Sequence, residues 1–546
     1  MNTETDGWRR SVFVVVLACC CGCSSLMGPA APPRYPISGY WFFGRGSRQA
    51  WREALTRAQA AGADTAIQFG PRPRLIDLDA LAKQKAFKKA PELVTSAVAE
   101  LAAVAPRAEI RRVLRYASQE NFGAALIVHP AYERSVHVGE TVLWRLVFPF
   151  DAAGNASDLD SATVVDLFFV IGSARDSVAM LLAEAGELEM QVFVGMPTAP
   201  QHPQYPWDPW GRVMPTFLRF SDRVLLDYAQ RFGDSKAFVG VYQSVELPVA
   251  AKPLVAVLHC YRQQHALVRR RLVGKRIMVS PYWDARKRRP TGVTPASVRE
   301  GIGHIARTDV DIIAPQDSRG TGKVGLFWKS QAGDPVAAGL RCVSGVGETT
   351  YGEAYHASTR DFYRVAREAV DALAKEGIKV ELWANLEGFA PGKGVPCGSF
   401  TTTQRTTKER LDRQIMMAGT HPAKIISYMW DSYYTAKAGR SETLADAILA
   451  VPDRPIAVEA HREGERLVVV GYHLAGGDIE IRDGRRSLTI PSKARTTQAL
   501  AQRTPGRYPE HMMQITAPWP AKAGDAYVQV RVKTDRGWSQ PLVIGE

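Results

Sequence analysis

The chain has 546 residues, of which 46% are hydrophobic, 23% charged and 9% aromatic, with 69 Lys and Arg against 55 Asp and Glu. This composition excludes a disordered, a collagen-like and a small disulfide-rich protein. The length predicts about three domains with ample apolar material for a core, and the net charge of +14 bears on partners rather than on fold.

Residues 1–23 have the pattern of a bacterial lipoprotein signal peptide. A basic pair and the apolar run of residues 11–18 precede Cys19 and Cys23, and this run is too short to span a bilayer permanently. We expect export and lipidation at Cys19 or Cys23, which would place the protein in the cell envelope, on the periplasmic side of the outer membrane. The alternatives are an ordinary cleaved signal or an uncleaved anchor. Residues 24–36 form a proline-rich linker.

From residue 37 onward, short apolar runs alternate with amphipathic segments, which is typical of a parallel β/α architecture. We predict strands at residues 37–43, 64–69, 190–196, 237–247, 276–282, 310–315, 378–383 and 423–430. We predict helices at residues 47–61, 221–232, 253–272, 295–307, 359–376, 406–419 and 441–450. This alternation predicts the α/β fold class and a (β/α)₈ TIM barrel over residues 37–452.

Two regions depart from the alternation. Residues 71–172, after the second strand, carry extra apolar runs and predict an inserted α/β element, because a structureless loop of this length is improbable. In residues 453–546 the helical periodicity ends, and short alternating strands are separated by Gly, Asp and Pro. This predicts an immunoglobulin- or fibronectin-like β-sandwich, which either packs on the barrel or presents substrate.

Acidic side chains lie at the carboxyl ends of the fourth and seventh predicted strands, at Glu246 and Glu387. Active sites of TIM barrels lie at the carboxyl ends of the strands, and glycoside cleavage requires two carboxyl groups. We predict Glu246 as the general acid, with its pKa raised by burial among aromatic side chains, and Glu387 as the nucleophile or base. Asp317 is a third catalytic candidate, as a base or as a residue that orients Glu246. The alternative is that each glutamate is a strand-end salt-bridge partner.

Aromatic, amide and charged side chains occupy other predicted strand ends, as a saccharide site requires. The predicted substrate-binding residues are Trp41, Gln68, Gln243, Tyr282, Trp283, Arg286, Gln316, Trp383, Asn385, Trp430 and Asp431. The alternative for each aromatic residue is packing. The sequence contains no GxSxG, Walker or HExxH motif, and we expect neither a cofactor nor a metal.

Three of these segments also resemble a known family. They are Ala-Pro-Gln-Asp at 314–317, Trp-Ala-Asn-Leu-Glu-Gly-Phe at 383–389 and Val-Tyr-Gln-Ser-Val-Glu-Leu-Pro at 241–248. The family is the bacterial Domain of Unknown Function 4434, and the resemblance covers about residues 37–450 without the insertion. It implies a glycosidase-like TIM barrel, often followed by a β-sandwich, and no defined substrate.

These observations lead to two main hypotheses of function. The first is an exported glycoside hydrolase that acts on a polysaccharide. The second is a non-catalytic, polysaccharide-binding lipoprotein that serves export or attachment of a surface polymer. A barrel isomerase or lyase is disfavoured because no phosphate-binding glycine loop follows the last two strands. We expect a monomer whose partners are a saccharide and, through the lipid, a membrane, and no nucleic acid.

Basic side chains follow the fifth and sixth predicted strands. Residues 286–289, Arg319, Lys323 and Lys329 would lie on the active face, where they would attract an anionic polysaccharide. The alternative is an ordinary solvated surface.

Three cysteines follow the signal region. Cys342 and Cys397 lie in the loops after strands six and seven, and we predict a disulfide between them because an exported protein folds in an oxidising compartment. Cys260 lies within a predicted helix, where a buried thiol is expected.

Overall fold

The computed structural model describes residues 34–546 except 118–128, 130–131, 206, 392–402, 438–441, 485, 505, 521–527 and 545–546. The predicted signal peptide, with Cys19 and Cys23, lies outside the described residues, and so does Cys397. Within the described part of the chain, no helix is both long enough and apolar enough to cross a bilayer.

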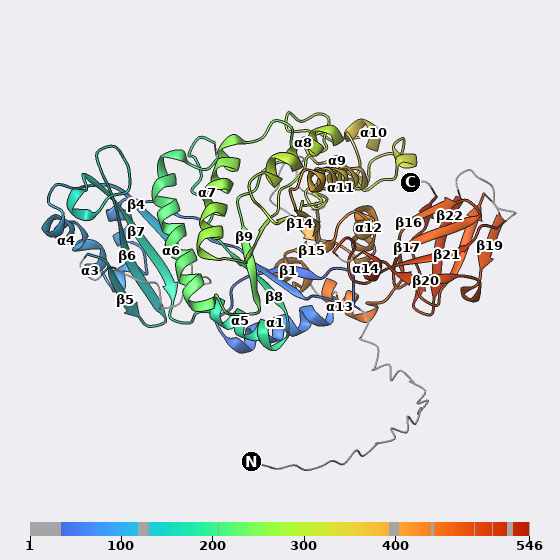
Figure 1. Cartoon of the computed structure of the whole chain (residues 1–546), viewed down its shortest axis with the longest axis horizontal. Helices are drawn as coiled ribbons and strands as arrows, with labels where there is room; N and C mark the ends of the chain where they lie inside the picture. Colours follow the sequence, from blue (N-terminus) through green and yellow to red (C-terminus); the bar gives the residue numbers. More distant parts are fainter. Residues whose placement is uncertain are drawn as a thin grey trace, which may run out of the picture. The chain divides into compact units, whose positions relative to one another are not determined.

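Eight parallel strands of the described chain close into a barrel, of which β1, β8, β9 and β15 are labelled in Figure 1. The neighbour order is β1-β15-β12-β11-β10-β9-β8-β2. The strands are β1 (Gly39–Phe42), β2 (Thr65–Gln68), β8 (Gln191–Gly195), β9 (Phe238–Gln243), β10 (Arg276–Val279), β11 (Ile312–Ile313), β12 (Glu381–Glu387) and β15 (Lys424–Tyr428). The helices that follow them are α1 (Arg48–Ala60), α5 (Ser177–Glu187), α6 (Met214–Phe232), α7 (Val255–Arg271), α8 (Pro295–Ala306), α11 (Thr359–Lys375), α12 (Lys408–Ala418) and α13 (Leu444–Ala450). The predicted (β/α)₈ barrel is confirmed.

Polar side chains fix where several of these helices begin. Ser47 accepts a hydrogen bond from the backbone N–H of Ala50 at the start of α1, and Ser358 and Asp361 form a reciprocal capping box at the start of α11. Such caps satisfy backbone donors that the first helical turn leaves without partners.

Side chains along each barrel strand alternate between the barrel interior and the surrounding helices. The inward side chains form one buried cluster that contains Trp41, Ile67, Phe193, Tyr242, Met278, Ile312, Trp383 and Ile426. In β12 the inward positions run from Trp383 through Asn385 to Glu387. The strand therefore extends four residues beyond its predicted end at residue 383, and Glu387 is its last residue.

The insertion after β2 forms a five-stranded sheet with the order β3-β4-β7-β6-β5. Its strands are β3 (Arg74–Leu75), β4 (Glu109–Ala117), β5 (Arg134–Val138), β6 (Thr141–Phe150) and β7 (Val164–Ser173), and its helices are α2 (Leu78–Ala82), α3 (Glu92–Thr95) and α4 (Ala97–Val104). These helices and the short 3₁₀ helix Phe87–Lys89 pack on one face of the sheet around Leu93, Leu101 and Phe169. One of the apolar runs of this segment, residues 122–128, lies outside the described residues.

The other face of the inserted sheet packs against α6 of the barrel. The rings of Phe168 and Phe220 stack with centroids 4.1 Å apart. Asp166, which is fully buried, accepts a hydrogen bond from Thr216 in α6 and pairs with Arg111 in the sheet. The insertion is therefore fixed to the barrel by apolar packing and by a buried, fully paired carboxylate.

The C-terminal residues form two antiparallel sheets, with orders β16-β17-β21-β20 and β19-β18-β22-β23, and β24 pairs with β22. The strands are β16 (Ile456–Glu463), β17 (Arg466–Tyr472), β18 (Asp478–Asp483), β19 (Arg486–Ile490), β20 (Thr496–Ala499), β21 (Met512–Pro518), β22 (Val528–Thr534), β23 (Gly537–Trp538) and β24 (Leu542–Val543). β16 contacts β22 and β24 of the second sheet and α12 of the barrel. The immunoglobulin- or fibronectin-like topology stays a prediction.

Candidate functional site

Glu387 is only 3% exposed at the end of β12. Its Oε2 accepts hydrogen bonds from the backbone N–H groups of Gly320 and Thr321, the latter at 3.2 Å. Burial and the negative charge of Asp317 raise the pKa of Glu387 to about 8, although the charge of Lys323 opposes the rise. At neutral pH the Glu387 carboxyl group therefore holds a proton.

Gly320 is required by this geometry. A β-carbon at this position would collide with the ring of Phe389. Because glycine has no side chain, the backbone N–H of Gly320 can approach the Glu387 carboxyl group while Phe389 packs against the same turn.

Asp317 follows β11 and is fully buried beside Glu387. Its Oδ1 accepts from the backbone N–H groups of Arg319 and Glu387, both at 3.2 Å, and its Oδ2 accepts from Gln414 Nε2 at 2.6 Å. Burial raises the pKa of Asp317, and these three donors oppose the rise. Since the donors stabilise the ionised form of Asp317, we assign the proton of this pair to Glu387.

Lys323 and Tyr428 lie within electrostatic range of both glutamates. Burial lowers the pKa of Lys323, and the negative charges of Glu387 and Glu246 oppose this. Burial raises the pKa of Tyr428 to about 12, and the same two glutamates add to the rise. Lys323 Nζ also lies 4.0 Å from the ring centroid of Tyr282. Glu246 and Glu387 therefore surround a common set of side chains.

Three of the predicted substrate-binding residues lie next to one another beside the glutamates. Bridges pair Tyr282 with Gln316 and Gln316 with Asn385. Gln316 Nε2 donates to Glu246 Oε1 at 2.9 Å, and Asn385 Nδ2 donates to Ser280 Oγ at 2.9 Å. Glu246, Asp317, Glu387 and these three residues therefore lie together at one end of the barrel, and their roles stay predictions.

The environment predicted for Glu246 is wrong. Its side chain is exposed rather than buried among aromatic residues. It lies three residues beyond Gln243, the last residue of β9. The buried carboxyl group with the raised pKa is that of Glu387 instead.

Four predicted substrate-binding residues point outward and pack against helices. Gln68 neighbours the inward Ile67 and therefore points away from the barrel interior. Gln243 donates to Gln264 of α7. Trp283 stacks on Phe362 of α11 with ring centroids 5.4 Å apart, and Trp430 stacks on Tyr434 at 5.5 Å. All four are 2% exposed or less, so the structure contradicts their predicted role, and the packing alternative holds.

Trp41 and Trp383 point into the barrel but are also buried away from solvent. Trp41 packs on Tyr242 and Tyr428 beneath the glutamates. Trp383 lies at the opposite end of the barrel, where the first residues of β10 and β15, Arg276 and Lys424, contact its ring. Neither indole is available for substrate. Trp383 was misplaced because β12 is longer than predicted.

Two predicted charged contacts are occupied by partners within the chain. Arg286 is 2% exposed and forms a bidentate ion pair with Asp284, at 2.8 Å and 2.7 Å. Asp431 pairs with Arg45 and accepts a hydrogen bond from the backbone N–H of Phe43 at 2.8 Å. The predicted attraction of an anionic polymer by Arg286 is therefore wrong.

The cysteine predictions have different outcomes. Cys260 is buried in α7, and burial raises its pKa to about 12, which confirms the predicted buried thiol. Cys342 is exposed. Because Cys397 lies outside the described residues, the disulfide between them stays a prediction.

Several residues near the site were absent from the prediction. Gln414 donates to Asp317, and Tyr428 lies within electrostatic range of both glutamates. Tyr428 could have been predicted from sequence, because it lies two residues after Ile426 and therefore on the same, inward face of β15. The loop between β8 and α6 also presents Tyr205 and Trp207, which are 61% and 70% exposed. Among the residues that the structure describes, no cluster of His, Cys, Asp and Glu is arranged to hold a metal ion.

Solved structures offer only remote likenesses. An endo-β-1,4-mannanase from Thermotoga petrophila is 7% identical with a TM-score of 0.35, and the alignment covers 94% of this chain and 98% of that one. A β-galactosidase from the psychrophilic Marinomonas ef1 is 8% identical with a TM-score of 0.35, over 75% of this chain and 56% of that one. These similarities are too weak to bear on function. No curated protein matches the chain.

A family match is stronger and covers more than half of the chain. The family described as Domain of unknown function (DUF4434) matches residues 138–438. The match begins within the insertion, at the last residue of β5, rather than at the first barrel strand as the resemblance suggested. It contains Glu246, Asp317 and Glu387, and the chain belongs to this family.

Proposed function

We propose that the protein is an exported glycoside hydrolase that cleaves a polysaccharide. The observation that carries the proposal is the pair formed by Glu246 and Glu387. Both occupy inward positions at the carboxyl ends of barrel strands, where Glu246 is exposed and Glu387 is buried. The negative charges of both raise the pKa values of Lys323 and Tyr428. Two carboxyl groups in contrasting environments are what glycosidic bond hydrolysis requires.

The environments favour roles opposite to those predicted from sequence. Glu387 holds a proton at neutral pH because it is buried beside Asp317, which suits a general acid. Glu246 is exposed, receives a hydrogen bond from Gln316 Nε2 and lies within electrostatic range of Arg72, which suits a carboxylate that acts as nucleophile or base.

In the proposed reaction, Glu387 donates its proton to the glycosidic oxygen as the bond to the leaving sugar breaks. The Glu246 carboxylate either attacks the anomeric carbon or removes a proton from the attacking water. The anomeric configuration of the first product, read by NMR, distinguishes these two routes. Export and the lipid anchor belong to this proposal as well, through the cysteines of the N-terminal segment.

A non-catalytic polysaccharide-binding protein is the second candidate. It is favoured by the low exposure of Glu387 and by its two backbone hydrogen bonds, since a carboxyl group that secures the Gly320 turn also suits a purely structural role.

Incubation of the purified protein with a panel of bacterial surface polysaccharides separates the two candidates. We expect new reducing ends to accumulate in proportion to enzyme and time. Binding of a polymer without release of reducing ends, across pH 5–9, would instead favour the non-catalytic candidate.

Trp207→Ala is expected to weaken polysaccharide binding about two- to tenfold, because an exposed indole contributes about 0.5–1.5 kcal/mol by stacking on a sugar face. Since the side chain is 70% exposed, the melting temperature should not change. Titration of polymer by intrinsic fluorescence or calorimetry, together with thermal unfolding, checks both statements. Equal affinity of variant and wild type would exclude a role for this loop.

A further inference from the structure

A pocket of about 550 Å³ lies between the inserted sheet and the loop that follows β8. Its lining contains three arginines and one indole, those of Arg72, Arg74, Arg115 and Trp210, together with Gln201. The arginines come from the segment after β2 and from the first two strands of the insertion. The pocket therefore exists only because the insertion is present.

Two of these arginines face each other directly. Arg74 of β3 and Arg115 of β4 are register partners in an antiparallel pair. Like charges placed opposite one another on neighbouring strands destabilise a sheet. Among the described residues, none of the three guanidinium groups forms an ion pair, and Arg115 Nε is buried without a hydrogen-bond partner. The cluster lacks the counter-charge that this arrangement requires.

The pKa shifts of Arg72 and Arg115 also indicate that the cluster lacks a counter-charge. Burial and the positive charge of Arg74 lower the pKa of both Arg72 and Arg115. The negative charge of Glu246 partly opposes this at Arg72. The pocket is thus short of negative charge, and it lies within electrostatic range of one of the two proposed catalytic carboxyl groups.

We propose that this pocket binds the anionic substituent of a saccharide, so that the substrate of the barrel is an acidic polysaccharide. The substituent is a carboxylate, as in a uronic acid, or a sulfate or phosphate ester, because guanidinium groups bind each of these oxyanions in bidentate geometry. Trp210 supplies an aromatic surface for the sugar ring. The identity of the substrate rests on the proposed function, but binding of the anion does not.

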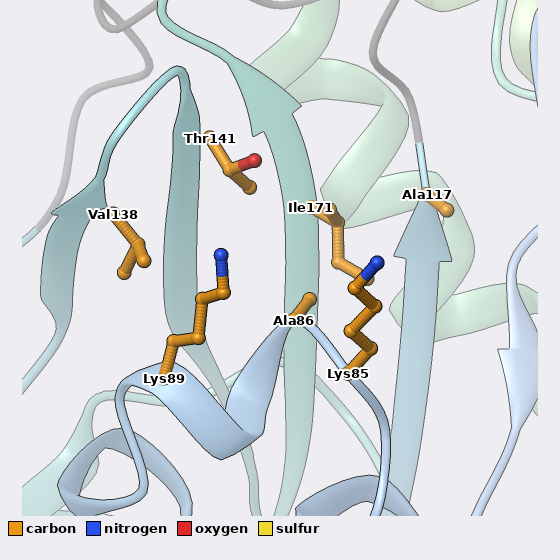
Figure 2. Close-up of a pocket in the computed structure, with 7 residues that line it drawn as sticks. All are labelled: Lys85, Ala86, Lys89, Ala117, Val138, Thr141 and Ile171. Atoms are coloured by element: carbon orange, nitrogen blue, oxygen red, sulfur yellow. The ribbon is translucent and has the colours of Figure 1, made fainter.

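A second pocket, of about 560 Å³, continues the basic surface over the inserted sheet. Ala117, at the end of β4, lines both pockets. Figure 2 shows Lys85 and Lys89 extending from the same segment into this second pocket, toward the strand ends that carry Ile171 and Thr141. Successive acidic units of one polymer would therefore meet basic side chains in both pockets.

The test compares binding of matched probes to the wild-type protein and to the Arg74→Ala and Arg115→Ala variants. The probes are polygalacturonate oligomers, their neutral methyl esters, and sulfated and phosphorylated dextran oligomers, titrated by calorimetry at two salt concentrations. We expect at least one anionic probe to bind at least tenfold more tightly than its neutral counterpart, with affinity falling as salt rises. Each arginine variant should lose about tenfold or more of that preference. The anionic probe that binds best identifies the substituent.

Arg270→Ala is the matched control, because it removes the same charge from an exposed guanidinium group of α7 that pairs with Asp222 of α6. This variant should bind as the wild type does. The melting temperatures of Arg74→Ala and Arg115→Ala should equal or exceed that of the wild type, since each relieves a like-charge pair.

Absence of binding to every anionic probe, or equal binding by wild type and both variants, would overturn the inference. Arginine-dependent binding without any release of reducing ends would leave the anion site standing and contradict the proposed hydrolase. Hydrolysis at the wild-type rate by both arginine variants would support the proposed hydrolase and contradict the anion site.

Discussion

Glu387→Gln is expected to lower kcat/KM for polysaccharide hydrolysis by about 10²–10⁴, the usual contribution of a positioned general acid. The amide retains the shape of the side chain but carries no transferable proton. Its oxygen can still accept the hydrogen bonds from Gly320 and Thr321, so the turn should be preserved. Initial rates of reducing-end release by the variant and the wild type, at equal enzyme concentration, measure the effect.

The pH profile of the wild type gives an independent readout of this role. Because the pKa of Glu387 is about 8 and the protonated form is the active one, kcat/KM should fall above about pH 8. Asp317→Asn removes a negative charge that raises this pKa, so the alkaline limb should move to lower pH. Lys323→Met removes a positive charge that lowers the same pKa, and the limb should move to higher pH.

Stability should change in a consistent direction. An ordinary glutamate in the unfolded chain titrates near pH 4.3, whereas Glu387 keeps its proton up to about pH 8. The free energy of unfolding contributed by this group is therefore fully present below about pH 4.3 and is lost as the pH rises through 8. Glu387→Gln abolishes this loss and should be at least as stable as the wild type at pH 9.

Glu381→Gln is the matched control. Glu381 begins the same strand, at the opposite end of the barrel, where it pairs with Arg276 at 2.7 Å. The same chemical change there should leave the rate of hydrolysis unaltered. A rate in Glu387→Gln that matches the control would contradict the assignment of the general acid.

The barrel could be predicted from sequence because each strand is a short apolar run that ends near Gly, Pro or a polar residue. Prediction of the site required more, namely the face on which each strand-end side chain lies. Gln243 and Glu246 are three residues apart and point in opposite directions, as do Ile67 and Gln68. A shift of one residue exchanges the inward and outward faces of a strand, and runs of apolar residues buried on both faces contain no signal for this choice.

Strand length caused a second class of error. The seventh strand was predicted to end at Trp383, before the polar Asn385 and Glu387, whereas pairing with β15 continues to Glu387. Trp383 was therefore assigned to the carboxyl end although it lies near the amino end of the strand. A barrel strand can contain polar side chains and still pair with its neighbours when these side chains point into the barrel near its carboxyl end, as those of Asn385 and Glu387 do.

The arginine pocket could not be predicted from sequence. Arg74 and Arg115 are separated by three short helices, and only the antiparallel pairing of β3 with β4 brings them together. By contrast, Arg286 lies in a conspicuously basic run, but its partner Asp284 is two residues away and neutralises it within the core. A run of basic residues in a sequence therefore does not predict a basic surface when a neighbouring carboxylate is buried with one of the arginines.

Asp284→Ala is expected to lower the free energy of unfolding by about 3–5 kcal/mol, the cost of leaving one member of a buried ion pair without its partner. Arg286 would remain buried, with a hydrogen bond to the Ser344 carbonyl at 2.6 Å but no counter-charge. Burial raises the pKa of Asp284, but the hydrogen bonds and charge of Arg286 outweigh it and hold this pKa below its usual value. The stabilisation is therefore present above about pH 3.9 and is lost as the pH falls below it.

Two further variants test whether the buried charge is the cause of this loss. Asp309→Ala breaks an exposed pair with Arg269 and should cost less than about 1 kcal/mol. The double variant Asp284→Ala/Arg286→Met removes both charges and should recover part of the loss. Chemical denaturation at pH 7, followed by tryptophan fluorescence, measures all three. Because Arg286 also donates to Ser344 in the long loop between β11 and α11 that carries Gly320 and Lys323, Asp284→Ala should reduce hydrolysis as well. A loss no larger than that of Asp309→Ala would show that the pair contributes little to stability.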